Sequence, residues 1–210
     1  MTMIRKFCTV LFLAAAVFAA APAVAADADP AASAFMQRLG ATAIQELTDP
    51  AVPLAERQAR FRTLLKQNFD MAAVSRFVLG RYWRSASEAQ RTEFQHLFED
   101  FIVASYSARF GEYRGDAFKV VGSSIDNGGV TIVHSRIDLP ASSEQVRVDW
   151  RLRGTNGDFA IVDIVVEGVS MAVTQRSEFA SVIQSRGGVD GLIDALRTKN
   201  SQSANSSSGQ

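Results

Sequence analysis

The chain has 210 residues, 47% of them hydrophobic and 21% charged, so it is long enough to bury a core of its own. Its 22 basic and 22 acidic side chains cancel, which excludes the positive charge excess typical of nucleic-acid-binding proteins. The only cysteine, Cys8, lies close to the N-terminus and can form no disulfide within the chain.

The N-terminus carries the features of a secretory signal peptide in their usual order. Arg5 and Lys6 precede the apolar run FCTVLFLAAAVFAAA, and small residues follow it up to Ala26. The run is shorter than the ~20 apolar residues of a membrane-spanning helix. We expect residues 1–26 to be a cleaved signal peptide; the alternative is an uncleaved anchor. Export means the periplasm in a Gram-negative cell, and residues 27–199 then form the domain.

The first half of the domain has helical periodicity. Apolar residues recur at helical spacing in 33–49 and 54–70, and prolines separate these two segments. A shorter apolar segment, 71–83, is interrupted at Gly80.

The strongest predicted helix begins at Ser87. Ser87 and Gln90 fit an S-x-x-Q capping box, and the helical pattern continues to about Tyr113. A helix of roughly 25 residues is ~38 Å long. Its broad aromatic face has to lie against a wide apolar surface, and we expect it to cover one face of a sheet. The residues of this face are Phe94, Leu97, Phe98, Phe101, Ile102, Ser105 and Tyr106.

The second half changes to the period-two pattern of β-strands. Four strand segments, 117–126, 127–139, 144–154 and 158–173, are joined by short turns, the clearest being Asp-Asn-Gly-Gly after residue 125. Consecutive strands with short turns predict an antiparallel meander. Helices, a sheet and further helices in sequence predict the α+β class: a helical layer packed on a twisted antiparallel sheet of four or more strands.

The strand 158–173, DFAIVDIVVEGVSMAV, is apolar on both sides. The alternate set from Ala160 to Ala172 has no charge, whereas the other set includes Asp163 and Glu167. We interpret the carboxylates as partners of arginines on the preceding strand, which turns the Ala160–Ala172 set inward. The arginines in question are Arg147, Arg151 and Arg153.

Helical periodicity returns after Thr174 and is interrupted at Gly187-Gly188. The last residues, 200–210, are polar and of low complexity. We expect them to form a disordered tail.

Signals for catalysis and metal binding are weak. Ser170 has a G-x-S-x-A setting, but both histidines, His96 and His134, precede it, and the predicted sheet is antiparallel. The chain has no zinc-protease, phosphate-loop or dinucleotide motif. We therefore expect neither an enzyme nor a metal or cofactor site, with a hydrolase acting through Ser170 as the remaining catalytic alternative. The apolar pattern itself fits either a filled core or a cavity for an apolar ligand between helix and sheet.

Two separated segments form a recognisable pattern. The first is Leu79-Gly80-Arg81-Tyr82-Trp83, followed by Ser87, Gln90, Arg91 and Phe94. The second runs from Asp163 to Ser170 and continues with Arg176-Ser177-Glu178-Phe179 and with Gly188 to Leu196. Together they resemble the MlaC, or toluene-tolerance, family of periplasmic phospholipid carriers, and the resemblance covers about residues 35–199.

Two positions depart from the family pattern. Phe159-Ala160 stands where the family often has Trp-Lys, and Thr174-Gln175 stands where it often has Asn-Tyr. These departures leave open a hopanoid-associated relative and affect the expected partners, but not the fold.

The resemblance implies a soluble periplasmic carrier with phospholipid as cargo and no cofactor. It implies shuttling between an outer-membrane lipoprotein–porin complex and an inner-membrane ABC transporter complex of the Mla type. The alternative is a ligand-free interaction module of an envelope complex. On this resemblance, acyl chains insert between helices and sheet, and the expected lining is Val78, Leu79, Trp83, Phe94, Leu97, Phe98, Phe101, Ile102, Tyr106, Val148, Trp150, Ile164, Val166 and Met171.

Overall fold

A computed structural model describes residues 28–112, 118–138, 145–155 and 157–208. The predicted signal peptide, residues 1–26, lies outside the described residues. The elements follow in the order α1 (Pro30–Leu47), α2 (Leu54–Asn68), α3 (Met71–Leu79), α4 (Tyr82–Ser85), α5 (Glu88–Glu112), β1 (Phe118–Ile125), β2 (Thr131–Asp138), β3 (Gln145–Thr155), β4 (Asp158–Val166), β5 (Val169–Ser170), α6 (Met171–Ser185) and α7 (Val189–Ser208).

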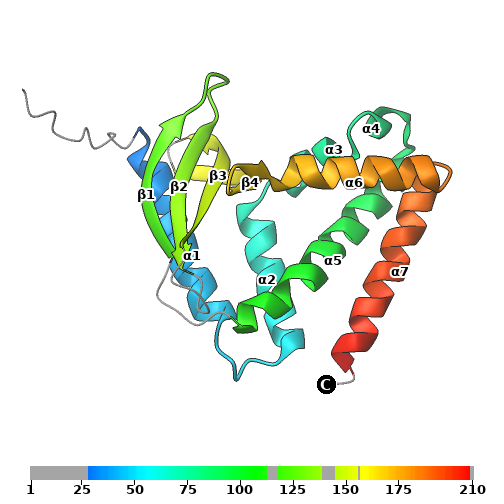
Figure 1. The fold of residues 1–210 in the computed structure, drawn as a ribbon, viewed down its shortest axis with the longest axis horizontal. Helices are drawn as coiled ribbons and strands as arrows, with labels where there is room; N and C mark the ends of the chain where they lie inside the picture. The colour runs from blue at the N-terminus through cyan, green and yellow to red at the C-terminus, as the bar shows by residue number, and fades with distance from the viewer. Residues whose placement is uncertain (1–27, 113–117, 139–144, 156, 209–210) are drawn as a thin grey trace, which may run out of the picture.

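The strands form one antiparallel sheet in the sequential order β1-β2-β3-β4-β5. The predicted α+β class and the antiparallel meander are confirmed (Figure 1). None of the described helices combines the length and the apolar character needed to cross a membrane.

The predicted turn between the first two strands is an Asp-anchored hairpin. Asp126 Oδ1 accepts hydrogen bonds from the backbone N–H groups of Gly128 (2.8 Å) and Val130 (2.9 Å). Asp126 Oδ2 accepts one from Arg151 Nη2 at 2.6 Å. The bond from Val130 is the largest cause that holds the pKa of Asp126 below its usual range.

Helix α5 has the predicted extent but not the predicted position. Ser87 N–H donates to Gln90 Oε1 (2.9 Å) and Gln90 N–H donates to Ser87 Oγ (3.2 Å), so the capping box forms as expected. However, α5 packs against α2, α3 and α7, and the expectation that it covers the sheet is wrong (Figure 1).

Helix α1 covers the sheet instead. It contacts β1 and β2, and a Cβ atom on Gly40 would come within 2.3 Å of the Phe118 ring, so the glycine permits this close approach. Between α1 and the sheet lies one apolar core, which we call the sheet cluster. Its buried members are Ala32, Met36, Val133, Leu152, Phe159 and Ile161, and Phe35, Leu39, Phe69, Phe118, Val120, Trp150 and Ile164 pack against it.

A second core lies among the helices, and we call it the helical cluster. Phe179 of α6 makes edge-to-face contacts with Phe94 and Phe98 of α5, with ring centroids 5.7 and 5.6 Å apart. The aromatic stripe of α5 therefore packs against α6 and α7, which explains why it does not reach the sheet. The buried members are Val78, Leu79, Ala86, Phe94, Phe98, Ala172, Phe179, Ile183, Leu192, Ile193 and Leu196.

A β-bulge changes which side of β4 faces inward. Arg151 pairs with Asp163 and Leu152 pairs with Ile161, so Val162 has no partner in the register with β3. Before the bulge the buried residues are Phe159 and Ile161, and the prediction that Ala160 and its alternate set face inward is wrong there. After the bulge, Ile164 and Val166 pair with Trp150 and Val148 and lie on the inner face as expected.

The predicted strand 158–173 ends earlier than expected. Glu167 (φ 48°) and Gly168 (φ 82°) make a two-residue turn between β4 and β5, with both central residues at positive φ as in a type I′ turn. Helix α6 then begins at Met171, because Ser170 Oγ accepts the Val173 N–H at 3.1 Å and caps the helix.

The polar segment after residue 199 is helical in the described part, where we expected disorder. Helix α7 continues to Ser208. Asn200 Nδ2 donates to the Leu97 carbonyl of α5 (3.0 Å), and the Ser201 hydroxyl donates to the Arg197 carbonyl (2.9 Å). These side-chain bonds tie a segment of weak helix formers to α5 and to its own preceding turn.

Replacing Phe179 with Ala should lower the free energy of unfolding by about 3–5 kcal/mol, because the cavity would open between three phenylalanines of α5. Val121→Ala, at an exposed position of β1, is the control and should change the stability by about 0.5 kcal/mol or less. Urea unfolding measures both, and equal effects would contradict the packing described.

The stability of the hairpin should depend on pH through Asp126. Because its folded pKa is lowered, the ionised carboxylate stabilises the fold above the usual Asp pKa, and this contribution is lost as the pH falls through the lowered value. Asp126→Ala should therefore lower the urea midpoint at neutral pH, and its difference from the wild type should narrow in acid. Asp158→Ala is the matched control and should not show this pH dependence. A difference in urea midpoint between Asp126→Ala and the wild type that widens in acid would contradict the assignment.

Candidate functional site

The fourteen predicted lining residues are divided between the two cores. Eight belong to the helical cluster or pack against it: Val78, Leu79, Trp83, Phe94, Leu97, Phe98, Phe101 and Ile102. Trp150 and Ile164 pack against the sheet cluster. Val148 is buried on β3, Val166 is its partly buried partner on β4, Met171 is the first residue of α6, and Tyr106 is 39% exposed on α5. The structure therefore does not gather the set into one site.

The two clusters meet where the chain passes from α2 to α3 beside β4. Asp70 N–H donates to the Ile161 carbonyl (3.0 Å), and Phe69 forms a parallel bridge with Ile161. Phe69 packs on the sheet cluster, whereas Met71, two residues later, packs on the helical cluster. We call this region the cluster boundary; partly buried apolar side chains border it from both cores.

One of the buried polar side chains on the inner face of the sheet, Ser135, has its hydrogen bonds satisfied. Ser135 on β2 is fully buried, and its hydroxyl donates to the Val148 carbonyl (2.8 Å) and accepts from Trp150 Nε1 (2.9 Å). A buried hydroxyl with both kinds of partner adds little penalty. The role of Ser135 was not predicted from the sequence, because its hydrogen-bond partners become visible only in the strand register.

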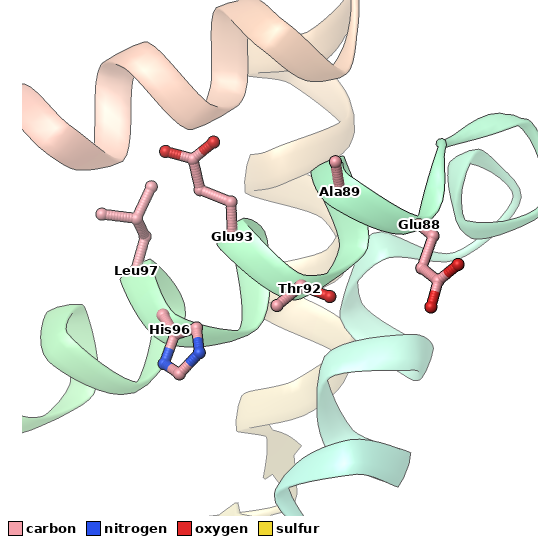
Figure 2. Close-up of a pocket in the computed structure, with 6 residues that line it drawn as sticks. All are labelled: Glu88, Ala89, Thr92, Glu93, His96 and Leu97. Carbon is pink, nitrogen blue, oxygen red and sulfur yellow. The ribbon is translucent and has the colours of Figure 1, made fainter.

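One hollow lies on the N-terminal half of α5 and measures about 650 Å³. Four of its six lining residues are polar or charged, and Glu93 pairs with Arg197 of α7. Figure 2 shows Glu93 and Leu97 directed toward α7, while His96 points to the other side of α5. The hollow is open to solvent and would not enclose acyl chains. The second hollow, about 260 Å³, lies between the end of α3, α4 and α6.

Ser170 has a structural role in this geometry. Its hydroxyl donates to Asp163 Oδ2 (2.6 Å) while it caps α6, and Ala172 N–H donates to Asp163 Oδ1 (3.0 Å). Asp163 thus fixes the exit from β4 into α6, and its predicted pairing with an arginine is wrong. Glu167 accepts the backbone N–H of Arg147, and Arg151 binds Asp126.

A chain of polar side chains crosses the outer face of the sheet. His134 Nδ1 lies 2.8 Å from Asp149 Oδ1, and its Nε2 lies 2.9 Å from Ser124 Oγ. The connectivity is that of a Ser-His-Asp triad. The strand register is enough to explain it, since His134 faces Asp149 directly and Ser124 diagonally. It links three strands and lies outside both clusters and both hollows described above.

Within the described residues, no three His, Cys, Asp or Glu side chains come together as metal ligands. The geometry thus defines an α+β protein whose distinctive features are two apolar clusters and the boundary between them. The family described as MlaC protein matches residues 37–198, more than half of the chain, and the chain belongs to this family.

Two relatives give the scale of the similarity. The chain is 26% identical over 131 residues to the intermembrane phospholipid transport system binding protein MlaC of Haemophilus influenzae; the alignment covers 60% of this chain and 58% of that protein, less than two thirds of its length. A solved phospholipid-binding protein from Ralstonia solanacearum, in complex with a phospholipid, matches with a TM-score of 0.74 at 22% identity. That match covers 84% of this chain and 99% of the other, and it shows a shared fold.

Ser170→Ala should destabilise the protein by about 1 kcal/mol through the lost helix cap, whereas Ser170→Thr keeps a hydroxyl and should restore most of the stability. Denaturant unfolding distinguishes the two. Equal stability of the three proteins would show that the cap contributes nothing.

Proposed function

We propose that the protein is a periplasmic phospholipid carrier of an Mla-type transport system. Membership of the MlaC family is the observation that carries this proposal, and the fold shared with a lipid-bound protein supports it. In this role the carrier receives phospholipid from one membrane complex and delivers it to another. The partners are an outer-membrane lipoprotein–porin complex and an inner-membrane ABC transporter complex.

The acyl chains would lie at the cluster boundary, in contact with side chains that still have apolar surface free. Five of the predicted residues, Val78, Leu79, Phe94, Phe98 and Val148, are at most 4% exposed and would support the wall from behind. Seven of the partly buried members would contact the lipid: Trp83, Phe101, Ile102, Trp150, Ile164, Val166 and Met171. Leu97, which is directed toward α7 and lines the first hollow, would not. Tyr106, at 39% exposed, would stand at the rim.

Transfer free energies favour such a slot. Each methylene that leaves a bilayer for water costs about 0.8 kcal/mol, so an extracted lipid needs apolar protein surface of comparable area. The step forms and breaks no covalent bond, and the proposed role needs no catalytic group. The Ser170 hydroxyl, already engaged by Asp163 and by the helix cap, is not required.

The alternative is a ligand-free interaction module of an envelope complex. Two observations favour it. The rings of Phe94 and Phe98, which were predicted to contact lipid, pack against Phe179 instead. In addition, no strand residue lines either of the two hollows described above. A hopanoid is the alternative cargo for the carrier.

Native mass spectrometry of the protein purified from periplasm without detergent tests the function. We expect a stoichiometric adduct that extracts as diacyl phospholipid, and the same adduct on Ser170→Ala. An adduct that extracts as hopanoid would change the cargo. A bare mass that persists after incubation with liposomes and the membrane complexes would contradict the carrier and favour the interaction module.

Photo-cross-linking tests the position of the lipid without emptying the core. Benzoylphenylalanine placed at Phe101 or Val166 should cross-link to bound lipid, because both side chains are partly buried and belong to the proposed lining. The same probe at the exposed Val121 of β1 should not. Cross-links at Val121 alone would place the lipid outside the proposed slot.

A further inference from the structure

The surface formed by α3, α4 and α6 is strongly basic, although the whole chain is neutral. Residues 71–86 contain three arginines and no acidic residue. Residues 171–186 add two arginines and one glutamate, so five positive charges less one negative charge leave +4. These segments lie together in space (Figure 1). The arginines are Arg76, Arg81, Arg84, Arg176 and Arg186, all exposed.

The second hollow lies within this surface and collects donor groups. Arg81, Tyr82, Arg176 and Gln184 line it. Arg81 Nη2 donates to the Tyr82 hydroxyl at 2.7 Å, and Gln184 Nε2 approaches the same oxygen at 3.5 Å. Two guanidinium groups, a phenol and an amide therefore converge from sequence positions about a hundred residues apart.

Both guanidinium groups are held in place by aromatic rings. The Arg81 guanidinium carbon lies 4.8 Å from the centroid of the Tyr82 ring, and that of Arg176 lies 5.3 Å from the centroid of Phe77. Gly80, at φ +59°, lets Arg176 lie across the end of α3, because a Cβ atom there would come within 2.8 Å of Arg176 Nε. This packing reduces the side-chain entropy that binding would otherwise remove.

The positive charge of the hollow is not neutralised within the described part of the chain. Arg62, Arg151 and Arg197 each pair with a carboxylate, whereas neither Arg81 nor Arg176 has an ion pair among the described residues. The hydrogen bond from Arg81 also lowers the pKa of the Tyr82 phenol from its usual value.

We propose that this hollow binds a phosphate group. Guanidinium groups offer parallel N–H donors that match two phosphate oxygens, and Gln184 and Tyr82 add donors beside them. The phosphate belongs either to a phospholipid head group or to free inorganic phosphate. In the first case the inference rests on the proposed carrier function; in the second it stands alone. Phe77 and Val173, 41% and 51% exposed on α3 and α6, give this surface apolar side chains that suit a lipid.

The test compares wild type with Arg81→Gln/Arg176→Gln. Arg109→Gln is the matched control, because Arg109 is also exposed and stacked on an aromatic ring, Tyr106, but lies on α5 away from the hollow. Backbone amide NMR during a titration with sodium phosphate, against sodium chloride at equal ionic strength, reports free phosphate. Co-flotation with phosphatidylglycerol-containing or pure phosphatidylcholine vesicles reports the head group.

We expect phosphate to shift the amide signals of Gly80 and Gln184, and the double variant to bind about tenfold more weakly or not at all. The control should bind like the wild type. If the wild type floats with phosphatidylglycerol vesicles and the double variant does not, the site binds a lipid head group. If phosphate shifts the amide signals but the wild type does not float with these vesicles, the site binds the free anion. Unchanged signals with phosphate, or equal binding by the double variant in both assays, would overturn the proposal.

Native mass spectrometry of the same variants separates this inference from the carrier function. We expect the double variant to be folded and to keep its lipid adduct, because the cluster boundary is untouched. A wild type that lacks lipid but binds phosphate through Arg81 and Arg176 would contradict the carrier and leave the site intact.

Discussion

The architecture depends on how the chain leaves the sheet. Asp163 accepts the Ser170 hydroxyl and the Ala172 N–H, and so joins the last long strand to the helix that follows. The turn at Glu167-Gly168 reverses the chain within two residues. This reversal is needed for β5 to pair with β4 and for Ser170 to reach its position as the cap of α6. Because α6 starts at this junction, the ring of Phe179 reaches α5 and the helical cluster closes.

The closure of the helical cluster explains why the interior is divided into two cores. An amphipathic helix whose apolar stripe has three phenylalanines could cover a sheet or other helices, and helix propensity does not distinguish the two. Here the aromatic stripe of α5 packs against α6 and α7, and α1 covers the sheet. Gly40 of α1 permits the close contact with Phe118. Two separate cores result, with the cluster boundary at Phe69–Met71.

The sequence predicted what local chemistry determines. The capping box at Ser87 and Gln90 defined the start of α5, and the Asp126 turn defined the first hairpin. The prediction was wrong where an extra residue or a distant partner determines the structure. The bulge at Val162 cannot be seen in the alternation of apolar residues. Asp163 accepts a hydrogen bond from the start of α6 and does not pair with an arginine. Of the candidate site, apolar character was predictable, but its division between two cores was not. The convergence of Arg81 with Arg176 also requires tertiary packing.

The backbone bond between Asp70 and Ile161 has a mechanical consequence. Each core is closed by its own rings and side chains, so separating them would not require either to repack. Besides the contacts of Phe69 and Asp70 with Ile161, the sheet side and the helices are joined where α3 and α6 meet β4 and where α1 meets α2. Opening between the two cores has to break the Asp70–Ile161 hydrogen bond together with these contacts, so exchange of the Asp70 amide with solvent deuterium would report that opening.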